Sequence, residues 1–123
     1  MQEQQQQEFL ARLTPDSQGL AFVVLGGSFA EAVDLPGKRL IGAFIATLGL
    51  PQVNPVNEQI KRRLDQLLGA GHDYTYLCPG LQKVVQAAGR IIRSKDDRGV
   101  LHLMDDRYQR SEVQRLLPRW WKL

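Results

Sequence analysis

The segment that decides the fold is Gln86–Arg93, which reads QAAGRIIR and lies in an apolar-periodic run that predicts a helix. On such a helix Gln86, Arg90 and Arg93 stand at i, i+4 and i+7, so they project from one face. Gly89 leaves a place without a side chain, where a ligand or another backbone can approach closely. One amide and two guanidiniums there suit a polyphosphate, because guanidiniums donate bidentately to acceptor oxygens. A surface helix with solvated arginines shows the same pattern, so the segment alone leaves both interpretations open.

Length and composition are those of one ordinary soluble domain. The chain has 123 residues, 43% hydrophobic and 24% charged, which is enough for one core, and we expect a single domain over 1–123. The longest apolar run, Leu40–Leu50, is too short to span a bilayer, and the polar, Gln-rich N-terminus is not a signal peptide. The single cysteine, Cys78, excludes an internal disulfide. These features predict a cytoplasmic protein without membrane contact.

Charge is distributed unevenly along the chain. The net charge is +3, but residues 1–37 carry one basic and five acidic side chains, whereas residues 82–123 carry ten basic and five acidic ones. A basic C-terminal third favours a polyanionic partner, either a nucleotide or a nucleic acid. The same imbalance occurs in proteins that bind neither.

Apolar runs alternate with helical patterns. The predicted strands are 19–25, 39–48, 74–77 and 100–104, and the predicted helices are 2–13, 55–68, 81–92 and 112–117. Gly69 is the expected C-cap of the second helix, and Pro79 the expected start of the third. Strands that alternate with helices predict an α/β layer with a mostly parallel sheet. We expect His102, within a predicted buried strand, to be a core histidine rather than a base.

A polar loop, GGSFAEAVDLPG at 26–37, follows the first predicted strand. In α/β sheets, ligands bind outside the carboxyl ends of the strands. Glu31 and Asp34 lie three residues apart in this loop, with Ser28 and the glycine amides nearby. The segment is a candidate ligand loop, although a plain connection in which Ser28 or Asp34 caps a turn fits the same residues.

Taken together, the motifs resemble the C-terminal RecA-like domain of XPD/DinG-like superfamily 2 DNA helicases. Q-x-x-G-R-x-x-R at 86–93 resembles motif VI, and GSFxExxDLPG within 26–37 resembles motif V, with Ala32 where that family usually has glycine. RSKDDRGVLHLMDDRY at 93–108 and LPRWW at 117–121 follow in the family's order. The resemblance therefore covers nearly the whole chain.

The resemblance implies a RecA-like, P-loop NTPase-type three-layer α/β fold that is incomplete at its N-terminal side. It implies ATP and Mg²⁺ as cofactors, bound mainly by an N-terminal RecA-like helicase domain in cis, because Gly37-Lys38 is followed by arginine and forms no P-loop here. A family iron–sulfur cluster needs four cysteines, so this segment holds none. The unpaired edge of an incomplete sheet favours self-association. The expected location is the bacterial cytoplasm or nucleoid.

The resemblance also assigns roles to single residues. Arg90 and Arg93 would be arginine fingers on the ATP phosphates, and Gln86 would orient the γ-phosphate or the attacking water. Glu31 and Asp34 would sense the nucleotide from the opposite side of the cleft.

Single-stranded DNA is the second ligand that the resemblance implies. Gly27, Ser28 and Phe29 would contact its backbone. The implied function is the C-terminal motor half of an ATP-dependent DNA helicase that unwinds 5′→3′. A stand-alone, non-catalytic nucleic-acid-binding or regulatory module with the same fold is the alternative.

We predict no metal site in this chain. Asp105-Asp106 follows a predicted strand as an acidic metal motif would, but a turn paired with Arg107 accounts for it better. His72-Asp73 and Cys78 are too sparse for a zinc site, which takes three or four ligands.

Overall fold

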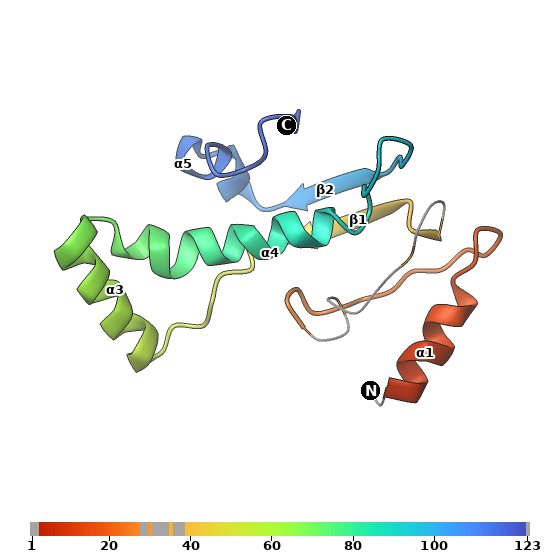
Figure 1. Ribbon diagram of the computed structural model, residues 1–123, viewed down its shortest axis with the longest axis horizontal. Coiled ribbons are helices and arrows are strands. Elements are labelled where there is room, and N and C mark those ends of the chain that lie inside the picture. Colours follow the sequence, from red (N-terminus) through yellow and green to blue (C-terminus); the bar gives the residue numbers. More distant parts are fainter. Residues whose placement is uncertain (1–2, 28–29, 31–34, 36–38, 123) are drawn as a thin grey trace. The chain divides into compact units, whose positions relative to one another are not determined.

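The protein is seen in a computed structural model that describes residues 3–27, 30, 35 and 39–122 (Figure 1). Its contacts divide the chain into two compact units. The first comprises Met1–Ala43 and Ala87–His102, and the second comprises Phe44–Gln86 and Leu103–Leu123. Helices and strands alternate along the chain, as predicted.

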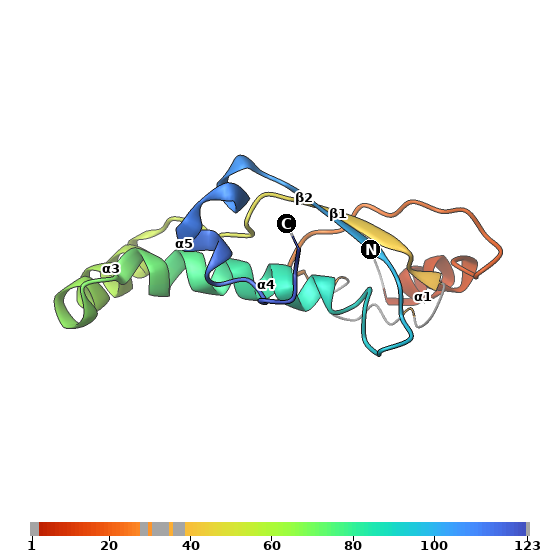
Figure 2. The same ribbon diagram turned by 90° about the horizontal axis from the view of Figure 1, so that it is seen from above.

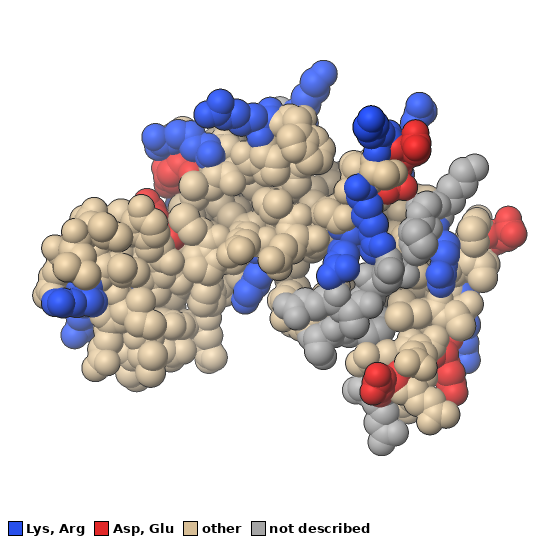
Figure 3. Space-filling model, in the orientation of Figure 1, with Lys and Arg blue, Asp and Glu red and all other residues tan. Residues whose placement is uncertain are grey.

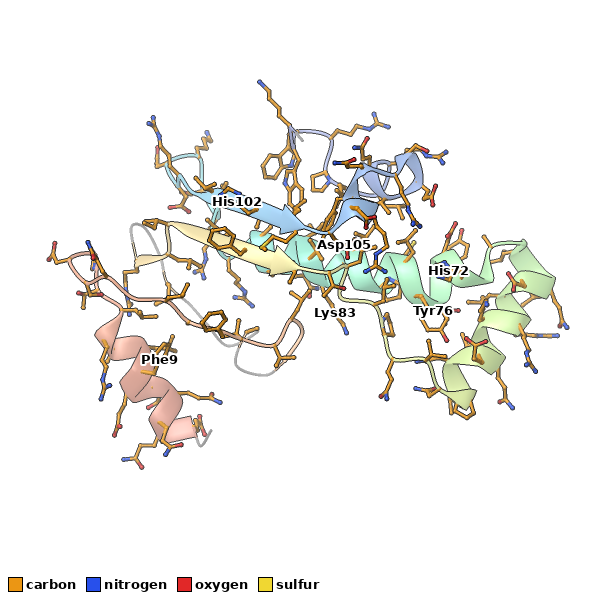
Figure 4. All side chains as sticks on the ribbon, turned by 180° about the vertical axis from the view of Figure 1, so that it is seen from behind. Phe9, His72, Tyr76, Lys83, His102 and Asp105 are labelled. Atoms are coloured by element: carbon orange, nitrogen blue, oxygen red, sulfur yellow. The ribbon has the colours of Figure 1, made fainter. Side chains whose placement is uncertain are left out.

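Two strands, β1 (Gly42–Ala46) and β2 (Val100–Met104), pair in the described sheet. They run in the same direction (Figure 4), and the N–H of Val100 donates to the carbonyl of Ile41 at 3.0 Å. Parallel strands need a long crossover, and the helices between β1 and β2 supply it. The predicted strands at 39–48 and 100–104 are confirmed, the first with narrower bounds. The mixed α/β architecture with a parallel sheet is a partial RecA-like fold, as expected.

The predicted buried strand at 19–25 is wrong. These residues form no strand, and Leu20, Phe22 and Val24 are 72%, 91% and 77% exposed. A buried parallel strand needs hydrogen-bonding neighbours and cover on both faces. The sheet of the described residues contains only β1 and β2, so nothing in it pairs with this run.

The expectation of a buried His102 is also wrong, because β2 is covered on one side only. Its residues alternate, with Leu101 and Leu103 half-buried and His102 exposed. Successive strand side chains point to opposite faces, so the histidine faces outward with Val100 and Met104.

In the first unit, α1 (Glu3–Arg12) confirms the predicted N-terminal helix. Arg39 fastens its C-terminal end: Nε donates to the carbonyl of Leu13 at 2.8 Å and Nη2 donates to that of Leu10 at 2.9 Å. The last carbonyls of a helix lack intrahelical donors and carry partial negative charge, so a guanidinium suits them.

In the second unit, α3 (Pro55–Leu68) has the predicted bounds and both ends are capped. The side chain of Asn54 accepts from the N–H of Asn57 at 2.8 Å, and Pro55 occupies the first turn, where its missing N–H costs nothing. Gly69 ends the helix with a φ of 69°, a left-handed conformation that favours glycine. The Gly69 prediction is confirmed.

The predicted strand at 74–77 is wrong, because Asp73–Leu77 forms a π-helix, η2, that runs directly into α4 (Cys78–Ala88). Aromatic and β-branched residues favour strands, but tertiary contacts override such preferences. Here the buried Tyr76 donates its hydroxyl to Glu58 Oε1 on α3 at 2.6 Å, and its ring lies 5.7 Å from that of His72 (Figure 4). The helix therefore starts before Pro79.

The hydrogen bond from Tyr76 to Glu58 makes the stability of the second unit sensitive to alkaline pH. The bond to Glu58, burial and the carboxylate charge raise the pKa of Tyr76 to about 12. Because the folded-state pKa exceeds the ordinary value of 10.0, the contribution to stability is complete below pH 10.0 and is lost as pH rises through about 12. We expect Tyr76→Phe to be less stable than wild type at pH 8, with a difference that shrinks towards pH 12. Thermal unfolding followed by circular dichroism would measure it; a difference that stays constant with pH would contradict the assignment.

The core of the second unit lies around α4, which Figure 2 shows from the side. Leu81 and Val84 on α4 are 2% and 0% exposed, and Leu48 after β1 is 1% exposed. Gly80 permits the close approach, since a Cβ there would lie 2.7 Å from the carbonyl oxygen of Leu48. A short 3₁₀-helix, η3 (Asp106–Gln109), and α5 (Ser111–Gln114) follow β2; α5 is shorter than the predicted 112–117 helix. No helix in the described part of the chain is long and apolar enough to cross a membrane.

Candidate functional site

The Gln86–Arg93 segment is a helix end followed by a turn rather than one continuous helix. The predicted helix at 81–92 is too long, because α4 ends at Ala88. Beyond it the N–H of Arg90 donates to the carbonyl of Ala87 at 3.1 Å, and that of Ile91 to the carbonyl of Ala88 at 3.0 Å. These i to i−3 bonds tighten the chain, and Gly89, a poor helix former, stands where the α-helix stops. The 3.6-residue period is broken there, so the predicted single helical face of Gln86, Arg90 and Arg93 does not form.

The buried side chain of Ile91 packs the turn after α4 against Gly99, within the first unit. Its side chain is 4% exposed, whereas Arg90 is half-buried and Arg93 is exposed. A Cβ added at Gly99 would collide with Cγ2 of Ile91 and lie 3.2 Å from the carbonyl oxygen of Ile41. The missing side chain at Gly99 is therefore what lets Ile91 pack against the start of β2.

We expect Gly99→Ala to destabilise the first unit by about 1–3 kcal/mol, because an added methyl group in a filled space forces a shift of the backbone or of Ile91. Chemical denaturation of the full-length protein, followed by a probe in this domain, would measure the change. The neighbouring Arg98→Ala is the matched control, since Arg98 is exposed, and should leave stability within about 0.5 kcal/mol. An equal effect of both variants would contradict close packing at Gly99.

Asp97 organises the backbone at the end of the turn. Its Oδ2 accepts from the N–H of Arg93 and from the N–H of Ser94, each at 2.9 Å. The bond from the Arg93 N–H, then that from the Ser94 N–H, holds the pKa of Asp97 below its ordinary value. One carboxylate thus fixes the direction in which the chain leaves Arg93. The sequence analysis placed neither helix nor strand between residues 92 and 100 and missed the role of Asp97; the acidic residue four positions after Arg93 is the signal that could have revealed it.

The other predicted site residues are placed as follows. Gln86 is exposed in the last turn of α4, in the second unit, whereas Arg90 and Arg93 belong to the first. Gly27 is half-buried, and its N–H donates to the carbonyl of Val24 at 2.9 Å in a turn where Gly26 has a φ of 75°. The predictions for Ser28, Phe29, Glu31 and Asp34 lie outside the described residues.

The Asp105–Arg107 turn is confirmed. Arg107 donates from Nε to Oδ1 of Asp105 at 2.8 Å and from Nη2 to Oδ2 at 2.6 Å, a bidentate pair. The side-chain and backbone hydrogen bonds from Arg107 hold the pKa of Asp105 well below its ordinary value. Beside it, the buried Tyr108 donates to the carbonyl of Thr47 at 2.8 Å. Because both carboxylate oxygens of Asp105 accept from Arg107, this side chain stabilises the turn.

Across the described residues, no group of three His, Cys, Asp or Glu side chains lies close enough together to hold a metal ion. The Gln86–Arg93 segment carries one side-chain amide and two guanidinium groups, and such groups suit acceptor oxygens like those of phosphates.

Comparison with known proteins decides the family. The family described as "Helicase C-terminal domain" matches residues 1–123. The chain belongs to the helicase C-terminal domain family. The predicted resemblance to XPD/DinG-like helicases is thereby confirmed.

Curated relatives to which this helicase C-terminal domain is similar are named as helicases. "ATP-dependent DNA helicase chl1" of Schizosaccharomyces pombe is 31% identical over 113 residues, which are 83% of this chain and 13% of that protein. "ATP-dependent DNA helicase chl-1" of Caenorhabditis elegans is 30% identical over 114 residues, 89% of this chain and 14% of that protein. "General transcription and DNA repair factor IIH helicase subunit XPD" of Arabidopsis thaliana is 31% identical over 106 residues, 80% of this chain and 13% of that protein. The helicase C-terminal domain thus spans only 13–14% of the length of these three relatives.

Proposed function

We propose that this helicase C-terminal domain is the second RecA-like half of the motor of an ATP-dependent DNA helicase. The full-length protein would couple ATP hydrolysis to translocation on single-stranded DNA and to unwinding in the 5′→3′ direction. The observation that supports this most directly is the match of residues 1–123 to the helicase C-terminal domain. Arg90 and Arg93 belong to the motif VI segment and lie in the turn that follows α4, in which the side chain of Ile91 is buried.

In this mechanism the N-terminal RecA-like domain, in cis, binds ATP and Mg²⁺, and hydrolysis of the bound ATP supplies the free energy for movement. Arg90 and Arg93 donate to the phosphate oxygens and stabilise the charge that develops in the transition state. Arginine fingers in related chemistry contribute roughly 10³–10⁵ in rate. Gln86 orients the γ-phosphate or the attacking water. Glu31 and Asp34, in motif V, sense the nucleotide across the cleft.

DNA contact is assigned to the segment before Glu31. Gly27, Ser28 and Phe29 would lie along the backbone of single-stranded DNA, with Gly27 offering a close approach of the main chain. Because these residues and the acidic pair lie within residues 27–34 of the sequence, a change in nucleotide state would be transmitted to the DNA through a short stretch of chain.

The test is DNA-stimulated ATPase and unwinding by the full-length protein. We expect single-stranded DNA to stimulate ATP hydrolysis, and a duplex with a 5′ single-stranded tail to be unwound faster than one with a 3′ tail. Faster unwinding of the duplex with the 3′ tail would contradict the proposed 5′→3′ direction. DNA binding without ATP hydrolysis at any DNA concentration would overturn the motor and favour a non-catalytic binding module.

A further inference from the structure

The C-terminal segment, which follows η3, is anchored in the second unit. Val113 on α5 and Leu117, four residues later, are 2% and 5% exposed, so both side chains belong to the core. The buried Tyr108 ties the start of the segment to the chain after β1 through its hydrogen bond to Thr47. Near the other end, the N–H of Trp121 donates to the carbonyl of Pro118 at 3.0 Å and closes a turn. These contacts fix the backbone of the segment.

Cationic side chains are exposed along the same segment. Arg110, Arg115, Arg119 and Lys122 are all exposed, and residues 108–122 contain one acidic residue, Glu112. None of the four cations forms an ion pair with a residue that the structure describes. Figure 3 shows Lys and Arg side chains along the upper edge of the view, over α5 and the C-terminal end that Figure 1 labels. This excess of positive charge favours a polyanionic partner.

An exposed indole lies among these cations. Trp120 directly follows Arg119 in the chain and is 68% exposed. Its ring meets that of the half-buried Trp121 at a centroid distance of 6.0 Å and an interplanar angle of 82°. In such an edge-to-face pair, each indole keeps at least one face that the other ring does not cover. An open aromatic face beside cations is the arrangement that binds single strands, because bases stack on the ring while phosphates pair with the charges.

We call Arg110, Arg115, Arg119, Trp120 and Lys122 the C-terminal basic surface. We propose that it binds single-stranded DNA, with one base stacked on Trp120 and the adjoining phosphates paired with Arg119 and Lys122. Arg110 and Arg115 extend the attraction towards α5. The inference rests on the proposed function in taking DNA as the nucleic acid. It adds a contact in the second unit, whereas motif V belongs to the first.

Other occupants fit the C-terminal basic surface less well. A DNA duplex supplies phosphates, but its bases are paired and stacked on one another, so they do not reach the indole. A second copy of this surface would bring like charges together, which is unfavourable.

The test is binding of labelled oligothymidylate by the full-length protein without nucleotide, measured by fluorescence anisotropy. We expect Trp120→Ala to weaken binding about tenfold, because the loss of one stacked base has an effect of this order. Trp120→Phe should keep most of the affinity, since phenylalanine retains a ring for stacking. Binding of a blunt duplex of the same length should not change in Trp120→Ala. Thermal unfolding would show that each variant is folded.

Neutral substitutions test the phosphate contacts. Arg119→Gln and Lys122→Gln should each weaken oligothymidylate binding and lower the slope of log affinity against log salt concentration by about 0.7, the value for one single-strand phosphate contact. Arg63→Gln is the matched control, because Arg63 is an exposed arginine of α3 in the same unit. It should change neither the affinity nor the slope.

Two measurements would overturn the proposal directly. One is wild-type affinity for oligothymidylate in Trp120→Ala, or an equal loss of duplex binding in that variant. The other uses the tryptophan emission that is present in wild type and absent in Trp120→Phe. If acrylamide does not quench this emission in the free full-length protein, the rest of the protein covers the ring. A wild type that binds no oligothymidylate would overturn the proposed function as well, whereas normal binding in all the variants would overturn this contact alone.

Discussion

Replacing Arg90 or Arg93 with alanine is expected to lower the DNA-stimulated ATP turnover of the full-length protein by about a hundredfold or more. This corresponds to roughly 3 kcal/mol of transition-state stabilisation lost with one charged donor. The expectation follows from the proposed motor function. The main-chain N–H groups of Arg90 and Arg93 bond to the carbonyl of Ala87 and to Asp97, so the backbone of each arginine is fixed before ATP arrives.

The measurement is kcat and KM for ATP at saturating single-stranded DNA, with thermal unfolding to show that the fold is intact. Arg98→Ala is the control, since it removes an exposed arginine from the same loop, and should retain near-normal turnover. Lysine at position 90 or 93 should restore little, because it keeps the charge but lacks the planar fork. Unchanged ATP turnover in both alanine variants would mean that the segment is only a surface turn. It would contradict the arginine-finger role.

Asp97→Ala is expected to give the second largest effect, a fall in kcat of roughly ten- to a hundredfold, because small misplacements of catalytic groups have costs of this order. The alanine variant removes the acceptor that holds the N–H groups of Arg93 and Ser94. Asp97 acts through Arg93 as a positioning residue, so kcat should fall more than KM for ATP rises. Steady-state kinetics at saturating DNA would measure both parameters.

Asp97→Asn separates positioning from general stability. The amide keeps one acceptor oxygen, so it should recover part of the lost kcat. The pKa of Asp97 is lowered, so its contribution to stability is present above the ordinary carboxyl range and declines as pH falls towards the lowered value. The Asn variant should lack this acid-side decline relative to wild type. Equal losses in kcat for both variants, with wild-type pH dependence of stability, would contradict the role.

Local patterns decided most of the helices and the two strands. Helix 55–68 was predicted with its observed bounds because its signals are short-range: an apolar period along it and Gly69 after it. Strands 39–48 and 100–104 were found from apolar runs between turn residues. The Asp105–Arg107 turn was likewise readable, because the pair is two residues apart.

The family was also readable from the sequence. Motif VI at 86–93 and motif V at 26–37, in the right order, were sufficient, and the family match over 1–123 confirms the result. The candidate site residues follow from those motifs and stay predictions. The roles proposed for Glu31 and Asp34 are among them.

Long-range contacts decided the rest. Residues 74–77 have strand-forming side chains, yet the bond between Tyr76 and Glu58, eighteen residues apart, accompanies a π-helix. The run at 19–25 is apolar enough for a buried strand, but a strand exists only where a neighbour accepts and donates its hydrogen bonds, and the described sheet offers none. The hydrophobic pattern of a segment indicates which secondary structures it can form. It does not indicate which other segment will pack against it or form hydrogen bonds with it.

The sequence by itself therefore determined the family and the positions of α1 and α3, because these depend on residue order and local spacing. Only the tertiary structure decided where α4 ends, how Ile91 packs against Gly99 and that Asp97 holds Arg93. Those features depend on which atoms meet after the chain has folded, and steric exclusion and hydrogen bonding act on distance in space rather than on distance along the chain.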